Sequence, residues 1–487
     1  LGKRDILSTM MCTPTRLLHL FVAALAITNH ATLAFVPHRP LPTTQTSMQL
    51  LSSERRSFLL ASLFGSFFGG GRMDPSKIKP NVPGAAGPTN EVVKKVQGIR
   101  RKRLGGSDII VSDLGLGTQR WVSADFNAPD EQQVFSFMDK AILQGGVNLI
   151  DTAEQYPIPS DGVTAQEGDS ERIVGKWIRA RKVPREKVVI ATKITGGRNV
   201  TPQNIISDCE GSLKRLGTDY IDVYQLHWPQ RYSPQSNWGQ SLSYNLERDS
   251  NSYWRGGGGP TTFEDLCLSM EKLIQQGKIR GWGLCNDNAY GLTACTRTAK
   301  ALGTTPPCSM QGDYSLLDRK SDENGVAEAA SPFNENVGFM AYNALAGGML
   351  TGKYMNVPAA VDDLTNRGRA KASLEKPRGR MDTRGWGGTL YRYRTEAAVS
   401  AIEQYNKLAK QAGMSLTEMS LRWCKERTLL TTTLVGHSNI DQLEESLLYF
   451  GKDEPLSEDL LWEIDRIHMQ NRLPLFSSTR TQKDWYG

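Results

Sequence analysis

The chain has 487 residues, of which 39% are hydrophobic and 22% charged, a balance typical of a soluble globular protein. The formal net charge is +7, but the first 72 residues hold seven basic and only two acidic side chains, so the rest is nearly balanced and no nucleic-acid-binding surface is indicated. The seven cysteines form no Cys-x-x-Cys pair and the histidines are scattered, which predicts neither a disulfide framework nor a metal site.

Residues 1–72 are expected to be a targeting leader. Arg16 precedes a short apolar run at residues 17–27, as in a signal peptide, and the run is too short to indicate a membrane span. Because residue 1 is leucine, we expect the natural start at Met10 or Met11. The Ala-Phe-Val-Pro sequence at 34–37 resembles the cleavage region of preproteins in algae with complex plastids, and a segment rich in Thr, Ser and Pro follows it.

A second leader signal starts at the Arg-Arg pair of residues 55–56, which precedes an apolar run. It resembles a twin-arginine signal, and the end of an ordinary transit peptide remains an equal alternative. We therefore expect a plastid protein, with the thylakoid lumen as one candidate compartment. Residues 73–98, rich in Pro and Gly, are expected to be a linker, and residues 480–487 a C-terminal tail.

From residue 99 to 479 the chain alternates strand-like and helix-like stretches. A Gly-Gly turn at 105–106 predicts a β-hairpin, after which a strand ends at Gly117-Thr118 and helical spacing covers 130–144. Further strands are expected near Leu149, Val189, Val223, 279–284, 309–314, 337–342 and 432–435, with helices near Ser170, Asn204, Phe263, Leu292, Val326, Ala397 and Gln442. Eight strand–helix pairs predict an α/β protein with a (β/α)₈ TIM barrel. A Rossmann dehydrogenase is disfavoured because no Gly-x-Gly-x-x-Gly follows a strand.

Two irregular stretches interrupt this alternation, at residues 228–260 and 354–393. Both follow the C-terminal end of a predicted strand, so we expect long loops at the C-terminal face of the barrel.

Four chemically distinct side chains close consecutive strands. Asp151 ends one strand and Tyr156 follows five residues later, while Lys193 and His227 end the next two. Because parallel barrel strands end on one face, these groups should converge. A phenol beside an ammonium, a carboxylate and an imidazole suits proton donation. The alternative is a structural ion-pair network, which would not explain the central phenol.

The motifs Asp-Thr-Ala-x-x-Tyr at 151–156, Ala-Thr-Lys at 191–193 and Leu-His-Trp-Pro at 226–229 resemble those of the aldo-keto reductase superfamily. The resemblance covers about residues 99–479 and is nearest to bacterial and plastid members and to potassium-channel β-subunits. It implies that the hairpin plugs the bottom of the barrel and that NADPH reduces an aldehyde or ketone. It also implies roles: Tyr156 is the general acid, Lys193 lowers its pKa, Asp151 orients Lys193, and His227 positions the carbonyl oxygen.

The same resemblance implies a cofactor site. Asn286 and Gln311 would hold the nicotinamide carboxamide, with Cys285 where serine is usual, and residues 342–354 would clasp the pyrophosphate although Asn343-Ala344 replaces Ser-Pro. Residues 436–446 would bind the adenosine phosphate at a helix N-terminus, unless this is simply a capped helix. The implied cofactor residues are Gly117, Thr118, Asp151, Cys285, Asn286, Gln311, Tyr342, Leu345, Gly347, Lys353, Arg380, Gly436, Ser438, Gln442, Glu445 and Ser446.

The adenosine-phosphate loop departs from the family at His437 and Ser446, where a small residue and asparagine are usual. It contains no Lys or Arg, so recognition of a 2′-phosphate would depend on Ser438, Gln442 or Arg380.

Three functions are compatible with these residues. The leading hypothesis is an NADP-dependent oxidoreductase that acts on a small-molecule carbonyl substrate, without metal, nucleic acid or an integral membrane span in the mature protein. The second is a nucleotide-binding redox-sensing or regulatory module with slow turnover. The third, a non-redox barrel enzyme for phosphorylated metabolites, has no use for Asp151, Tyr156 and Lys193 together. The sequence does not decide the substrate or the oligomeric state.

Overall fold

The computed structural model describes residues 84–233, 244, 246, 261–355, 378–382, 390, 393, 395–472 and 474. All of them belong to one compact unit, Arg72–Gly487. The expected leader at 1–72, most of the expected loops at 228–260 and 354–393, and the tail at 480–487 lie outside the described residues. Within the described part of the chain, no helix is long and apolar enough to cross a bilayer.

Eight parallel strands close into a barrel, so the predicted (β/α)₈ fold is confirmed. Each strand pairs with its neighbour in chain order, and β11 closes the ring against β4. Most strand residues are buried, which explains why the strands appear in the sequence as apolar runs rather than alternating patterns. The strands are β4 (Leu114–Gly117), β5 (Leu149–Asp151), β6 (Val189–Ile194), β7 (Ile221–Leu226), β8 (Ile279–Cys285), β9 (Ser309–Asp313), β10 (Gly338–Tyr342) and β11 (Leu430–Val435).

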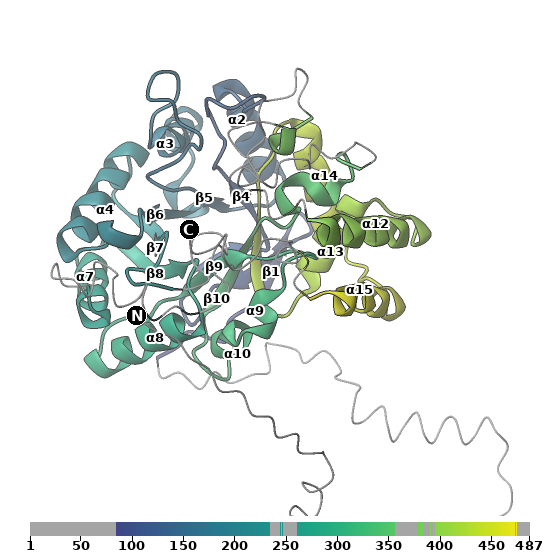
Figure 1. Ribbon diagram of the computed structural model, residues 1–487. Helices are drawn as coiled ribbons and strands as arrows, with labels where there is room; N and C mark the ends of the chain where they lie inside the picture. Colours follow the sequence, from purple (N-terminus) through teal and green to yellow (C-terminus); the bar gives the residue numbers. More distant parts are fainter. Residues whose placement is uncertain are drawn as a thin grey trace, which may run out of the picture. The chain divides into compact units, whose positions relative to one another are not determined.

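Helices surround the strands (Figure 1). Several begin at a polar side chain that accepts a hydrogen bond from the first helical turn, such as Thr201, Thr262 and Ser415. The helices are α2 (Glu131–Met138), continued by the π-helix η2 (Asp139–Gln144), then α3 (Asp169–Arg181), α4 (Pro202–Leu216), α7 (Phe263–Gln275), α8 (Ala289–Leu302), α9 (Lys320–Glu323), α10 (Val326–Ala330), α12 (Glu396–Gln411), α13 (Leu416–Glu426), α14 (Ile440–Gly451) and α15 (Glu458–Gln470).

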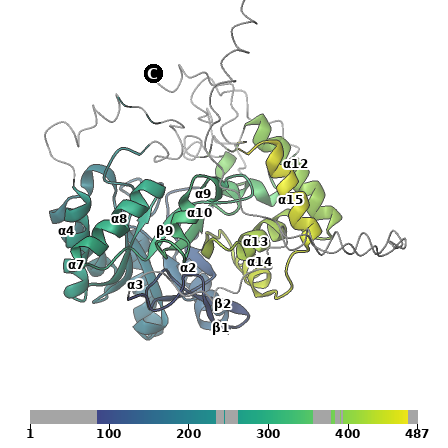
Figure 2. The same ribbon diagram turned by 90° about the horizontal axis from the view of Figure 1, so that it is seen from below.

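The seventh helix of the ring differs from the prediction. The helix expected near Ala397 exists as α12, but α12 packs on α15 and α13, and it is α13 that packs on β11. Figures 1 and 2 both show α12 and α15 side by side. The cause is that α12 and α13 are both amphipathic, so apolar spacing alone does not identify the surface that each helix covers.

An antiparallel three-stranded sheet closes the bottom of the barrel. It consists of β1 (Val92–Val96), β2 (Ile99–Arg103) and β3 (Ile110–Ser112). The hairpin residues Leu104, Ile109 and Val111 are buried in one cluster with barrel residues such as Val189 and Val223. The expected hairpin plug is therefore present. Strand β1 lies inside the stretch 73–98 that we expected to be a linker.

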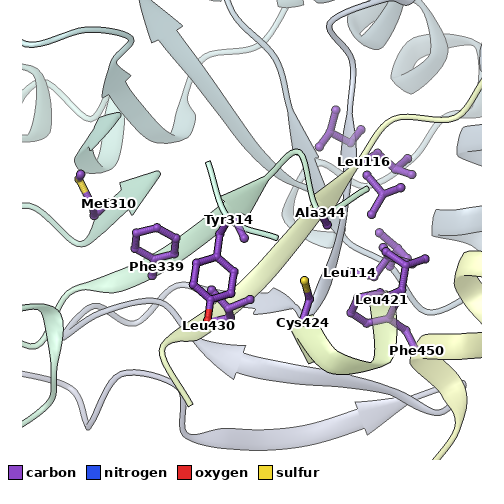
Figure 3. Packing of buried hydrophobic residues seen from close by; sticks show 14 of the residues in the cluster. Leu114, Leu116, Met310, Tyr314, Phe339, Ala344, Leu421, Cys424, Leu430 and Phe450 are labelled. Atoms are coloured by element: carbon purple, nitrogen blue, oxygen red, sulfur yellow. The ribbon is translucent and has the colours of Figure 1, made fainter. Parts of the chain in front are cut away.

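The main core lies between the strands and the helices. Figure 3 shows Leu114 of β4 near Leu421 of α13 and Phe450 of α14, and Leu430 of β11 near Tyr314, with Cys424 of α13 between them; all are buried. This packing holds β11 beside β4 and so fixes the strand ends that carry the site.

Candidate active site

A pocket of about 920 Å³ opens at the C-terminal ends of the strands. Tyr156 and His227, which follow β5 and β7, line one part of it. Residues from the segment 436–446, which runs from the end of β11 into α14, line another. The pocket therefore spans the region where the sequence predicts a catalytic centre and a phosphate-binding helix end.

A buried ion pair joins the pocket-lining Asp151 to Lys193, which is not part of the pocket lining. Lys193 Nζ donates to Asp151 Oδ1 at 2.5 Å and to the carbonyl oxygen of Thr152 at 2.8 Å, and the Lys193 side chain is fully buried. Asp151 Oδ2 accepts from Gln311 Nε2 at 2.8 Å and from Gln225 Nε2 at 3.4 Å. The carboxylate is thus held by three donors, and it fixes the position of the ammonium.

The phenol of Tyr156 lies between this ion pair and an imidazole. Lys193 Nζ is 5.2 Å from the centroid of the Tyr156 ring. The ring meets His227 edge to face, with centroids 5.6 Å apart, and Trp228 stacks against His227 at 6.1 Å. The four predicted groups therefore form one constellation, with Tyr156, His227 and Asp151 on the pocket wall.

The pKa of Tyr156 differs from the expectation. Burial, the Asp151 carboxylate and Cys285 raise the pKa of the phenol well above its usual value. We expected Lys193 to lower this pKa, but Lys193 is paired with Asp151, and the carboxylate has the larger effect on the protonated phenol. Tyr156 is therefore protonated at neutral pH.

His227 is neutral in this environment. Burial, and secondarily the charge of Lys193, lower the pKa of its imidazole well below the usual value. Its Nδ1 is buried and has no hydrogen-bond partner among the described residues. A neutral imidazole carries a single N–H, so His227 can donate one hydrogen bond to a ligand oxygen.

Asn286 and its neighbours form the next part of the wall. Asn286 has φ +58°, and its Oδ1 accepts from Tyr342 Oη at 2.5 Å while its Nδ2 donates to the His227 carbonyl at 3.0 Å. Burial raises the pKa of the Cys285 thiol to about 12, so the residue that replaces the family's serine remains a neutral thiol. Gln311, the second expected carboxamide ligand, lies at the pocket but is hydrogen-bonded to Asp151.

After β10 the chain turns through several residues with a left-handed backbone conformation. Asn343 and Ala346 have φ values of +59° and +49°, and Gly347 and Gly348 have +66° and +99°, within the 3₁₀ helix η5 (Ala346–Thr351). Glycine adopts such values without steric cost, which lets the backbone curve around the pocket that this loop lines. The loop geometry is compatible with the expected pyrophosphate clasp.

Four cations line the same pocket: Arg120, Lys353, Arg378 and Arg380. Burial and then Arg120 lower the pKa of Arg380 to about 10. Burial, and then Arg380 and Arg120, lower the pKa of Lys353. Arg378 forms an ion pair at 2.7 Å with Asp382, the last residue of the 3₁₀ helix η7 (Arg380–Asp382). Mutual repulsion of this kind is relieved by an anion.

The N-terminus of α14 also lines the pocket. Asn439 caps the helix through Gln442 N at 3.0 Å, and Gln442 Oε1 accepts from Ser438 N at 2.9 Å. His437 Nε2 and Ser446 Oγ, the two departures from the family, lie 2.9 Å apart. The unusual residues therefore form one hydrogen-bonded pair, and burial lowers the pKa of His437 to about 3.

Every predicted site residue except Lys193 lines this pocket, and Lys193 lies directly behind Asp151. Arg120 and Arg378 also line the pocket, and no sequence motif predicted them. Arg120 could have been noticed because it stands two residues after the predicted strand-end Thr118. In the described part of the chain, no cluster of His, Cys, Asp or Glu could hold a metal ion.

The fold and the site together define a class: a (β/α)₈-barrel oxidoreductase with Tyr156, His227, Lys193 and Asp151 at its strand ends. Residues 113–468 match the Aldo/keto reductase family, and the chain belongs to this family. It is 32% identical to "Protein tas" of Escherichia coli strain K12 over 383 residues, which cover 76% of this chain and 98% of the relative. It is 33% identical to the "Aldo-keto reductase" of Babesia bovis over 305 residues, which cover 59% of this chain and 98% of that protein.

Proposed function

We propose that the protein is an NADP-dependent reductase that converts an aldehyde or ketone to an alcohol. The observation that carries this proposal is that a protonated Tyr156 and a neutral His227 share one pocket with a group of cations and a helix N-terminus. The first pair suits a carbonyl oxygen, and the cations and the helix end suit the phosphates of a dinucleotide.

The residues present fit NADPH. The buried Thr118 Oγ1 and His227 Nδ1 have no hydrogen-bond partner among the described residues, and the charge of Arg380 lowers the pKa of Lys353 in the same pocket. Such groups favour a ligand with polar and anionic atoms. When bound, NADPH would supply the hydride, with Asn286 beside its carboxamide and residues 436–446 beside its adenosine.

The remaining steps belong to the protein. His227 donates a hydrogen bond to the carbonyl oxygen and so orients the substrate beside Tyr156. Tyr156 then transfers its phenolic proton to that oxygen. Lys193 stabilises the resulting phenolate, and Asp151 holds Lys193 in place. The aromatic ring of Trp228 stacks on His227 and limits its rotation.

A second candidate is a nucleotide-binding regulatory module with slow turnover. It is favoured by the raised pKa of Tyr156, because a phenol with a high pKa is a weak proton donor.

The deciding experiment measures NADPH oxidation with a panel of aldehydes, ketones and quinones, using wild type, Tyr156→Phe and the control Tyr290→Phe. Tyr290 is 67% exposed on α8, outside the pocket lining. We expect Tyr156→Phe to lose roughly 10²–10⁴-fold in turnover while NADPH affinity changes little. Turnover of Tyr156→Phe within a few-fold of wild type would favour the regulatory module instead.

We also propose that residues 1–72 direct the protein to a plastid. The support is the signal-like apolar run and the Ala-Phe-Val-Pro sequence at 34–37. A fluorescent protein fused to residues 1–72 should enter the plastid of an alga with complex plastids, whereas retention in the cytosol would contradict this proposal. The same fusion with Arg55 and Arg56 changed to Lys tests the thylakoid lumen, because a twin-arginine signal requires both arginines.

A further inference from the structure

Arg120 brings a cation to a loop that has none of its own. Residues 436–446 contain no Lys or Arg, yet Arg120 Nη1, from the segment after β4, donates to Ser438 Oγ at 3.1 Å. Ser438 stands just before α14, which begins at Ile440. Arg120 therefore adds a positive charge to the N-terminal end of this helix, a place that already favours anions.

The guanidinium of Arg120 is oriented by its other contacts. Its Nε donates to Asp125 Oδ2 at 3.0 Å, and its Nη2 donates to the Phe126 carbonyl at 2.7 Å and lies 2.9 Å from Asp125 Oδ2. Of the three nitrogens, Nη1 is the one directed at Ser438. The planar group thus presents one edge to its anchor and another to the pocket that it lines.

Arg120 also acts electrostatically on two other cations that line the pocket. It is among the charges that lower the pKa values of Arg380 and Lys353. Several partly buried cations that repel one another are a poor arrangement for an empty pocket. They become favourable when an anion lies among them.

The identity of that anion follows from the layout of the pocket. The hydride would be delivered beside Tyr156 and His227, so the nicotinamide would lie there and Ser438 and Gln442, in the same pocket, would hold the adenosine half. NADPH differs from NADH only by a phosphate on the adenosine ribose. A cation held at Ser438 can therefore distinguish the two cofactors, whereas a cation near the pyrophosphate cannot.

We infer that Arg120 is the residue that selects NADPH over NADH, by binding the 2′-phosphate together with Ser438 and Arg380. This inference rests on the proposed function, because it requires that the pocket take a nicotinamide dinucleotide. The fork of an arginine matches the oxygens of a phosphate, so lysine at the same place would be a weaker substitute.

The test is a titration of the full chain with NADPH and with NADH, followed by quenching of tryptophan fluorescence. The proteins are wild type, Arg120→Met, Arg120→Lys and the control Arg172→Met, which removes the same charge from an exposed position outside the pocket lining. We expect Arg120→Met to bind NADPH roughly 10- to 100-fold more weakly, the usual loss for a charge-assisted hydrogen bond. Its NADH affinity should stay within about twofold, and Arg172→Met should match wild type for both cofactors.

Arg120→Lys guards against a folding defect, because it leaves a cation beside Asp125. Its preference for NADPH over NADH should fall by about threefold or more. An unchanged preference in Arg120→Lys, or an equal loss of both cofactors in Arg120→Met, would overturn the inference and leave the proposed function standing. A wild-type protein that binds neither cofactor would overturn both.

Discussion

At the scale of single residues, Lys193 connects the stability of the barrel to its chemistry. Its side chain is fully buried and its partner Asp151 is 5% exposed, so neither charge is solvated by water. A buried pair of this kind adds little net stability, but loss of one partner leaves the other charge unsatisfied. The same ammonium is 5.2 Å from the ring centroid of Tyr156. A substitution of Lys193 should therefore affect both folding and proton transfer.

We predict that Lys193→Met lowers the free energy of unfolding by about 3–5 kcal/mol, because the Asp151 carboxylate remains buried without its cation. The double variant Lys193→Met/Asp151→Asn should regain much of this loss. Urea denaturation of wild type, the single variant and the double variant measures this free energy. A double variant no more stable than Lys193→Met would show that the unpaired charge is not the cause.

In kinetics, the losses of turnover in Lys193→Met and Tyr156→Phe should be far from additive, since both residues serve one proton transfer.

His437 gives a second prediction, on pH. Its folded pKa is about 3, below the unfolded value of about 6.5. As pH falls from about 6.5 toward 3, the unfolded chain binds a proton that the folded protein does not, so stability decreases. His437 alone should remove about 2 kcal/mol at pH 5. His437→Asn can still hydrogen-bond Ser446 but does not titrate there, so it should lose less stability between pH 7 and 5. If wild type and His437→Asn lost the same stability between pH 7 and 5, measured by thermal or urea unfolding, His437 would not be the source of this pH dependence.

At the scale of elements, strand ends were predictable and the surfaces between elements were not. Asp151, Lys193 and His227 could be placed together because parallel barrel strands end on one side. The positions of α12 and α13 could not, because an apolar face does not specify its partner. The contact of Arg120 with Ser438 joins residues 318 apart and leaves no local pattern. The raised pKa of Tyr156 depends on burial, which only the packed structure provides.

Strand β1 and the residues before it lead to a third prediction. Asn90 has φ +67°, its Nδ2 donates to the Thr428 and Leu429 carbonyls at 2.7 and 3.2 Å, and its Oδ1 accepts from Thr431 at 2.5 Å. It ties the plugging sheet to β11. We expect Asn90→Ala to lose about 2–4 kcal/mol, because buried backbone carbonyls and a hydroxyl lose their partner.

The variant Asn90→Gly separates the loss of the Asn90 hydrogen bonds from the cost of a left-handed backbone at an alanine. Glycine accepts the left-handed backbone, so its loss comes from the hydrogen bonds alone and should be somewhat smaller than that of alanine. The exposed Lys94→Ala on β1 is the control and should change stability by less than about 0.5 kcal/mol. A chain that begins at residue 91 lacks Asn90 and should show a loss similar to Asn90→Ala, whereas a chain that begins at residue 84 should not.

At the scale of the whole molecule, the cysteine thiols of the described residues share one property, their burial. All six cysteines in the described part of the chain are buried. Burial raises the pKa of Cys209, Cys285, Cys308 and Cys424 to about 12 and also raises that of Cys267 and Cys295. Alkylating reagents attack the thiolate, so they should scarcely react with these thiols while the protein is folded.

The labelling rates of these six thiols can therefore report local unfolding of the barrel. They are distributed around the ring, on α4, α7, β8, α8 and α13 and just before β9. Iodoacetamide should alkylate each thiol at the rate at which local unfolding of the surrounding strand or helix exposes it. Cys267 Sγ lies 3.6 Å from the carbonyl oxygen of Cys295, so these two should be labelled together, independently of Cys424 on α13. Peptide mass spectrometry after timed labelling would then give the order in which the barrel comes apart, without any engineered probe.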